Sequence, residues 1–276
     1  MITCCGRNGC DGGDGAGLAE VIVIIGIYFS GTGNSRHCVE TFVRCYDDAC
    51  NAVSIENSDI RQLLSDQELI VFGYPVYYSN IPKIVRDFIF NNKDCFQNKK
   101  IFIIATMGML SGDGAGCAAR ILKKCGATIV GGLHLIMPDC IGDEKVLKKS
   151  LEAKKEAIEK ANKKILMAVE NLKSGNPPQN GLSAINQISG FLMQRLWFSQ
   201  MTSSYKNKPK IDKEKCTGCG RCVSLCPMKN MDVVHGKAQA NGKCTLCYRC
   251  FSHCPAKALT ILGRQVHEQY LFVNCK

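Results

Sequence analysis

Apolar runs alternate with amphipathic stretches from about residue 21 to residue 173. The apolar runs predict five buried strands: Val21–Phe29, a weaker Ala52–Ile55, Leu69–Gly73, Lys100–Thr106 and Ala127–Met137. The stretches between and after them repeat apolar residues at a helical spacing and predict five helices: Ser35–Asp47, Asp59–Leu64, Ile81–Asn91, Gly114–Cys125 and Glu144–Lys173. Strands that alternate with helices are typical of a parallel sheet covered on both faces. We therefore predict an α/β fold with a doubly wound, five-stranded parallel sheet.

The regular alternation ends after residue 173. Ser174–Leu182 contains two prolines and two glycines and is interpreted as a boundary. A connecting helix is predicted for Ala184–Met201, and the Gly-rich residues 1–20, which show no periodicity, are predicted to form a flexible extension. The chain is thus expected to comprise an extension (1–20), a first domain (21–174), a linker with the connecting helix (175–210), a second domain (211–263) and a tail (264–276).

Cysteine stands out in the composition, with 19 among 276 residues. The N-terminal segment carries Asp11, Asp14 and Glu20 but only one cation, Arg7, so it does not resemble a secretion signal. No apolar run reaches the about 20 residues that a membrane-spanning helix needs. We therefore expect a cytoplasmic protein without a membrane span, in which clustered cysteines indicate metal rather than disulfides.

Two cysteine runs near the C-terminus carry the strongest chemical signal. The first run (Lys215–Lys229) has the spacing Cys-x2-Cys-x2-Cys-x3-Cys-Pro, and the second run (Lys243–Lys257) repeats it 28 residues later with Lys, Thr, Arg and Ser at matched positions. Zinc sites usually use two pairs of ligands at wider separation, and disulfides gain nothing from this regularity. The candidate metal ligands are Cys216, Cys219, Cys222, Cys226, Cys244, Cys247, Cys250 and Cys254.

The spacing of these runs resembles that of bacterial ferredoxins, and the resemblance implies a small α+β domain holding two [4Fe–4S] clusters. Three thiolates two residues apart can wrap three corners of one cluster, whereas the fourth corner cannot come from the same tight loop. The expected ligand sets are therefore crosswise, with Cys216, Cys219, Cys222 and Cys254 on cluster one and Cys244, Cys247, Cys250 and Cys226 on cluster two.

The loop Ser30-Gly31-Thr32-Gly33-Asn34-Ser35 follows the first predicted strand and precedes a helix. Glycines and small hydroxyl residues in such a turn gather backbone N–H groups at the positive end of the helix, which favours a phosphate. The loop lacks the Lys of a nucleotide-hydrolysing loop and the third Gly of a dinucleotide fingerprint, so it predicts a site for a terminal phosphate, with an ordinary tight turn as the alternative. Loops 74–80 and 106–114 follow the third and fourth strands, at the edge where doubly wound sheets bind ligands.

These three loops together resemble the FMN site of flavodoxins, and the whole chain resembles flavodoxin–ferredoxin fusion proteins. The resemblance implies that the FMN phosphate is held by Ser30, Thr32, Gly33, Asn34 and Ser35. It also implies that Tyr77 or Tyr78 lies against the isoalloxazine ring, with Thr106, Met107 and Gly108 along its other side. The second loop has no glycine and the third no aromatic residue, so the match to the family is incomplete there.

Charge decides between two classes of partner. The net charge is +11, and residues Tyr205–Lys276 hold 13 basic and 4 acidic side chains. Two oxidised clusters with their thiolates would offset about four of these positive charges, and no aromatic-and-basic recognition motif accompanies them. We therefore expect protein redox partners and no nucleic acid. The resulting prediction is an electron-transfer protein that couples two [4Fe–4S] clusters to FMN; a flavin-dependent reductase of quinones or nitro compounds and an iron–sulfur redox sensor remain as alternatives.

Overall fold

A computed structural model describes residues 23–77, 80–109, 114–183 and 208–275 of the chain. The predicted extension 1–20, the predicted connecting helix Ala184–Met201 and Tyr78 lie outside the described residues.

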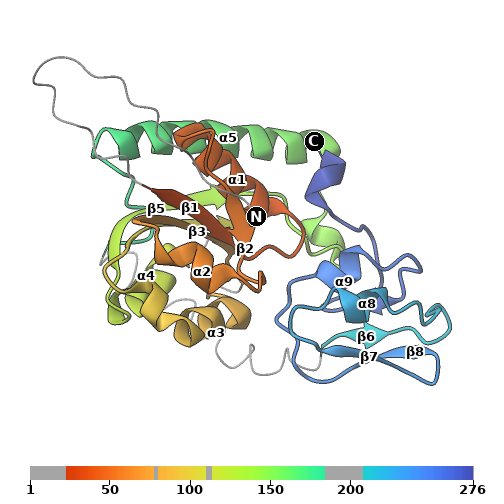
Figure 1. Ribbon diagram of the computed structural model, residues 1–276. Coiled ribbons are helices and arrows are strands. Elements are labelled where there is room, and N and C mark those ends of the chain that lie inside the picture. The colour runs from red at the N-terminus through yellow and green to blue at the C-terminus, as the bar shows by residue number, and fades with distance from the viewer. Residues whose placement is uncertain (1–22, 78–79, 110–113, 184–207, 276) are drawn as a thin grey trace, which may run out of the picture.

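A five-stranded sheet forms the centre of the N-terminal domain (Figure 1). Its strands are all parallel and follow the order β2-β1-β3-β4-β5. This order is that of a flavodoxin-like doubly wound sheet, in which ligands bind where the order reverses. The predicted fold class is therefore confirmed. The strands are β1 (Ile24–Tyr28), β2 (Ala52–Ser54), β3 (Leu69–Pro75), β4 (Lys100–Met107) and β5 (Thr128–Ile136).

Helices cover both faces of this sheet (Figure 1). One face packs against α1 (Asn34–Tyr46) and α5 (Leu151–Lys173). The other packs against α2 (Ile60–Ser65), α3 (Lys83–Asn91) and α4 (Gly114–Lys124), with a short 3-10 turn, η1 (Lys93–Phe96), after α3. Because both faces are covered, the strands are continuous apolar runs rather than alternating ones.

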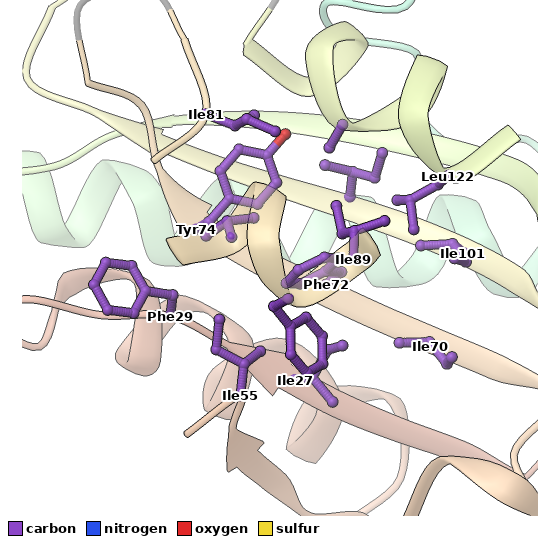
Figure 2. Packing of buried hydrophobic residues seen from close by; sticks show 14 of the residues in the cluster. Ile27, Phe29, Ile55, Ile70, Phe72, Tyr74, Ile81, Ile89, Ile101 and Leu122 are labelled. Atoms are coloured by element: carbon purple, nitrogen blue, oxygen red, sulfur yellow. The ribbon is translucent and has the colours of Figure 1, made fainter. Parts of the chain in front are cut away.

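The core under α2, α3 and α4 is built around aromatic side chains (Figure 2). The Phe72 ring lies 5.7 Å from the Tyr74 ring and 6.0 Å from the Phe88 ring, both edge to face. Tyr74 is fully buried, and its hydroxyl donates to the Gly114 carbonyl at 2.7 Å, which satisfies the polar end of the ring. This bond joins the end of β3 to the start of α4.

The last helix of the domain begins later than the sequence pattern predicts. The expected helix Glu144–Lys173 is wrong in its first seven residues, because residues 145–147 form a separate 3-10 turn, η2 (Lys145–Leu147), and α5 starts at Leu151. Ser150 caps α5: its Oγ accepts the Ala153 N–H at 3.2 Å. Residues 144–150 contain three lysines, as the helix itself is rich in lysine, so the Ser150 cap is the main sequence signal for this start.

The C-terminal unit is a small α+β arrangement (Figure 1). Strand β6 (Lys210–Ile211) pairs with β9 (Leu259–Thr260), and the hairpin strands β7 (Met231–Val234) and β8 (Lys237–Ala240) pair with each other, all antiparallel. Each cysteine run contains one short helix: α8 (Arg221–Ser224) in the first and α9 (Arg249–Ser252) in the second.

The predicted tail packs back onto the N-terminal domain. It ends in a 3-10 turn, η5 (Phe272–Cys275), that contacts α5 (Figure 1). Phe272 stacks on His37 of α1 with ring centroids 4.3 Å apart, and Cys275 is a free but buried thiol. Within the described residues, no helix combines the length and the apolar character needed to cross a membrane.

Candidate functional site

A cavity opens at the carboxyl ends of β1, β3, β4 and β5, where the three predicted loops meet. Its wall includes most of the residues predicted from the sequence: Ser30, Thr32, Asn34, Ser35, Tyr77, Thr106, Met107 and Gly108. Sequence reasoning missed two further parts of the wall. Residues 137–141, which follow β5, could have been found from the rule that ligands bind at the carboxyl ends of strands. Leu246 and Tyr248 of the second run carry no such signal, because they reach the cavity only through contact between the two domains.

Backbone N–H groups at the start of α1 form a cradle for an anion. Gly33 has a left-handed φ of 108°, and its N–H donates to Ser30 Oγ at 3.1 Å, which tightens the turn. The N–H groups of Thr32, Asn34 and Ser35 meet no hydrogen-bond acceptor among the described residues. Unpartnered N–H groups at the N-terminus of a helix attract a phosphate, and no neighbouring cation is needed for this attraction.

Several predicted side chains support the cradle instead of facing a ligand. Ser35 and Thr106 are buried, and their hydroxyls lie 2.7 Å apart, joined by a hydrogen bond. Asn34 donates from Nδ2 to the Pro138 carbonyl at 2.8 Å and accepts the Tyr270 hydroxyl at 2.6 Å on Oδ1. These bonds tie the loop after β1 to the loops after β4 and β5 and to the tail. The backbone of this loop therefore supplies the donors, and its side chains hold it in place.

The cavity is also bounded by Tyr77 and by the turn after β4. Tyr77 closes a tight turn with Asn80, each N–H donating to the other's carbonyl at 3.0 Å. Burial, with the Cys140 and Cys247 sulfurs nearby, raises the pKa of the Tyr77 hydroxyl well above its ordinary value, so the phenol stays neutral. Gly108 approaches Asp139 closely: a Cβ at Gly108 would lie 2.6 Å from Asp139 Oδ2.

The eight cysteines of the two runs fall into two groups. The first three cysteines of the first run and Cys254 line one small cavity. Cys226 lies instead near the first three cysteines of the second run, since it contributes electrostatically to the pKa values of Cys244, Cys247 and Cys250. The fold thus brings the last cysteine of each run to the other run, in the arrangement that crosswise ligation requires.

Backbone N–H groups point at the sulfurs of both groups. Cys216 Sγ accepts from Ala238 N and Cys226 Sγ from Asn230 N, both at 3.3 Å, and Cys244 and Cys254 have equivalent donors. Such donors stabilise thiolates and clusters that carry negative charge. Among the described residues, no group of three or more His, Cys, Asp or Glu side chains is placed to hold a single metal ion.

The two groups differ in their exposure to solvent. Cys219 of the first group is exposed, whereas Cys247, its counterpart in the second run, is buried. The Ala238 N–H lowers the pKa of Cys216. Burial raises the pKa of Cys244 to about 11 and that of Cys247 to about 12. The second group is therefore enclosed, and the first faces outward.

The second run touches the phosphate cradle directly. A Cβ at Gly31 would lie 2.0 Å from the Cys247 carbonyl oxygen, so only glycine allows the two backbones to come this close. Arg249 contributes to the same contact between the two domains, which we call the junction. Its guanidinium donates to the Ser30 carbonyl at 2.8 Å and to both carboxylate oxygens of Glu56 at 2.6 and 2.8 Å.

A second set of contacts closes the junction from the side of β5. Asp143, which is buried, accepts three backbone N–H groups on Oδ2, from residues 261–263, and the Tyr248 hydroxyl on Oδ1 at 2.9 Å. Lys154 of α5 pairs with Glu268 of the tail, and Gln269 donates to the Phe251 and Cys254 carbonyls at 2.8 and 2.7 Å. The tail thus holds α5, the cradle and the second run together.

Comparison with known proteins separates the same two regions. Residues 25–129 match the family model described as a flavodoxin domain, and residues 208–255 match that of a 4Fe-4S dicluster domain. A segment of 28 residues, 10% of this chain, is 46% identical to Ferredoxin-2 of Desulfomicrobium norvegicum and spans 48% of that protein, about half its length.

Two flavodoxins are among the solved structures to which the chain is similar. The flavodoxin of Megasphaera elsdenii in its two-electron reduced form is 24% identical, with a TM-score of 0.37, over 51% of this chain and 99% of its own. Oxidised Flavodoxin 2 of Bacillus cereus is 17% identical, with a TM-score of 0.41, over 55% of this chain and 98% of its own.

Proposed function

We propose that this chain, which carries an N-terminal flavodoxin domain and a C-terminal 4Fe-4S dicluster ferredoxin domain, passes electrons between two [4Fe–4S] clusters and a bound FMN. Both domain types are electron carriers, so electron transfer follows from the domain content. The finer proposal is that the two carriers work on each other inside one molecule, coupling one-electron and two-electron redox partners. The predicted cysteines would hold the clusters, and the loops after β1, β3, β4 and β5 would hold the FMN.

The residues around the cavity fit FMN. The N–H groups of Thr32, Asn34 and Ser35 suit its terminal phosphate, and the neutral Tyr77 with the Met107–Gly108 backbone suits the faces of a flat ring. When bound, FMN supplies two-electron chemistry beside clusters that carry one electron each. The chain's own contribution is to orient the cofactors, to exclude water and to set the local charge.

One observation carries the proposal: the backbone of Cys247, a ligand proposed for cluster two, rests on Gly31 of the phosphate cradle. The residues on either side of this cysteine, Leu246 and Tyr248, line the cavity itself. A cluster held by Cys247 would therefore lie next to the wall of the cavity proposed for FMN. Two domains that do not exchange electrons would not need this contact between the second run and the cavity.

Analysis of the anaerobically purified protein tests this function. We expect about eight irons and one FMN per chain, with spectra of two four-iron clusters. We also expect light-driven reduction of one cofactor type to be followed by electron exchange with the other at a rate independent of protein concentration. Protein that contains only zinc, or no flavin after reconstitution, would contradict the proposal. Turnover of a quinone or nitro compound faster than with free FMN would instead support the reductase alternative.

A further inference from the structure

We propose that a basic groove beside the first cysteine run is the docking site of an acidic one-electron redox protein. The groove, of about 700 Å³, lies along β6 and the segment from Ala256 to Val266. This inference rests on the proposed function, because it identifies where an external partner would exchange electrons with cluster one. It adds the chemistry of that partner and the residues that would recognise it.

The groove carries an excess of positive charge. Lys210, Lys257 and Arg264 line it and are exposed, and their side chains form no ion pair or hydrogen bond within the described residues. Lys215 also lines the groove and is paired with Asp212 at 2.8 Å, the one acidic residue of its wall. Four cations against one carboxylate leave a positive surface that attracts an acidic protein and speeds its encounter.

The groove adjoins the cavity formed by the cysteines proposed for cluster one. Ile211, Ala256 and Ala258 line both, so the same short segments separate a docked protein from these cysteines. Cys219, which lines this cavity, is exposed to solvent. The second group of cysteines offers no comparable access, because Leu246, Cys247 and Tyr248 are buried against the N-terminal domain. An external partner would therefore meet cluster one first.

The step is a simple outer-sphere exchange. A reduced iron–sulfur or flavin protein loses one electron and cluster one gains it, with no bond made or broken and no proton required. A single-stranded nucleic acid would also favour positive charge, but its binding sites typically add aromatic side chains on which the bases stack. Among the described residues that line this groove none is aromatic, and Ile211 and Val266 are the largest apolar side chains.

The duplication of the cysteine runs provides a matched control. Lys257 and Lys229 occupy equivalent positions, 28 residues apart, and both are exposed with left-handed φ values of 49° and 48°. Only Lys257 lines the groove. The substitutions Lys257→Glu and Lys229→Glu therefore change the charge equally and strain the backbone equally, and they differ in their place relative to the groove.

The test measures binding of an oxidised acidic two-cluster ferredoxin, used as the probe, to the full-length, iron-loaded protein by calorimetry. At low salt we expect Lys257→Glu to weaken binding by about fivefold or more and the triple charge reversal of Lys210, Lys257 and Arg264 by at least about 50-fold. Lys229→Glu should change binding less than about twofold, and raising the salt to about 0.3 M should remove most of the difference.

Equal losses for Lys257→Glu and Lys229→Glu, or binding that does not depend on salt, would overturn the docking site. Tighter binding of single-stranded RNA or of phosphatidylserine vesicles than of the probe, lost in the triple variant, would assign the groove to those partners instead. Reduction of cluster one by the dithionite-reduced probe should slow in parallel with binding. Because binding is measured on oxidised protein, it can succeed even if FMN is never bound, so failure of the proposed function would be recognised separately.

Discussion

The two cysteine runs have one backbone design and two different environments. In the first run, Gly218 and Gly220 adopt left-handed φ values of 68° and 73°. The equivalent residues of the second run, Leu246 and Tyr248, adopt φ values of 60° and 56° although they carry side chains. Left-handed backbone costs a residue with a Cβ about 1–2 kcal/mol, so the second run carries strain that the first avoids.

The cavity explains why the second run tolerates this strain. Leu246 and Tyr248 are buried, line the cavity, and lie on either side of Cys247; the Tyr248 hydroxyl also reaches Asp143. Burying such side chains gains about 1.5–3 kcal/mol each, which offsets the cost of the backbone conformation. The comparison teaches that a duplicated motif can be specialised at its non-ligand positions: the first run has half-buried glycines there, and the second has bulky side chains that form an interface.

The largest expected effect concerns the cysteine that each run lends to the other. Cys254→Ala should damage the cluster of the first run, and Cys226→Ala that of the second, because the structure places Cys254 with Cys216, Cys219 and Cys222. Each variant should retain about four of about eight irons, measured by iron analysis together with electron paramagnetic resonance of the remaining reduced cluster.

The two variants serve as controls for each other. The cluster that survives in Cys254→Ala should keep the enclosed environment of the second run and still exchange electrons with FMN. The cluster that survives in Cys226→Ala should not, since the cluster beside the cavity is lost. If each substitution removed the cluster of its own run, crosswise ligation would be wrong. Protein that fails to fold would be detected by far-ultraviolet circular dichroism and by the FMN content of the N-terminal domain.

An intermediate effect is expected from the arginine that directly precedes the third cysteine of each run. Arg249 bridges to Ser30 and Glu56, whereas its counterpart Arg221 is exposed. Arg249→Met should lower the free energy of opening the junction by about 2 kcal/mol, because hydrogen bonds to a charged group contribute about that much. Arg221→Met should leave the junction unchanged.

Hydrogen exchange of the loops 30–35 and 139–143 measures this junction. Exchange through opening of the junction should become roughly 30-fold faster in Arg249→Met and stay near the wild-type rate in Arg221→Met. Electron exchange between cluster and flavin should slow in the first variant only. Unchanged protection in Arg249→Met would show that the contacts of Asp143 and the tail hold the domains without the arginine.

Local pattern accounts for the parts of the molecule that could be predicted. The sheet and its helices follow from apolar periodicity, and the cradle and the cysteine runs follow from short motifs in which neighbouring residues act together. The sequence pattern places the start of α5 seven residues too early, because the Ser150 cap is a weak signal beside a Lys-rich segment.

Contacts between distant segments could not be predicted in the same way. Nothing near Asn34 in the sequence indicates that Tyr270 binds it, and nothing near Gly31 indicates Cys247. The duplicated sequence shows Leu246 and Tyr248 where the first run has glycines. Only the structure shows that these two side chains line the cavity. These contacts depend on packing between segments that are distant in the sequence. The same residues would be exposed if the domains were separate.

The smallest expected effect isolates one hydroxyl of the specialised run. Tyr248→Phe keeps the buried ring and the left-handed backbone and removes the hydroxyl that donates to Asp143, which retains three backbone donors. The junction should lose about 1 kcal/mol, seen as roughly fivefold faster exchange of the 139–143 amides. Tyr46→Phe is the control, because the Tyr46 hydroxyl makes no hydrogen bond in the described residues and its ring contact with Lys173 survives the change. A loss as large as that of Arg249→Met would mean that the hydroxyl, and not the apolar body of Tyr248, sustains the strained conformation that distinguishes the second run from the first.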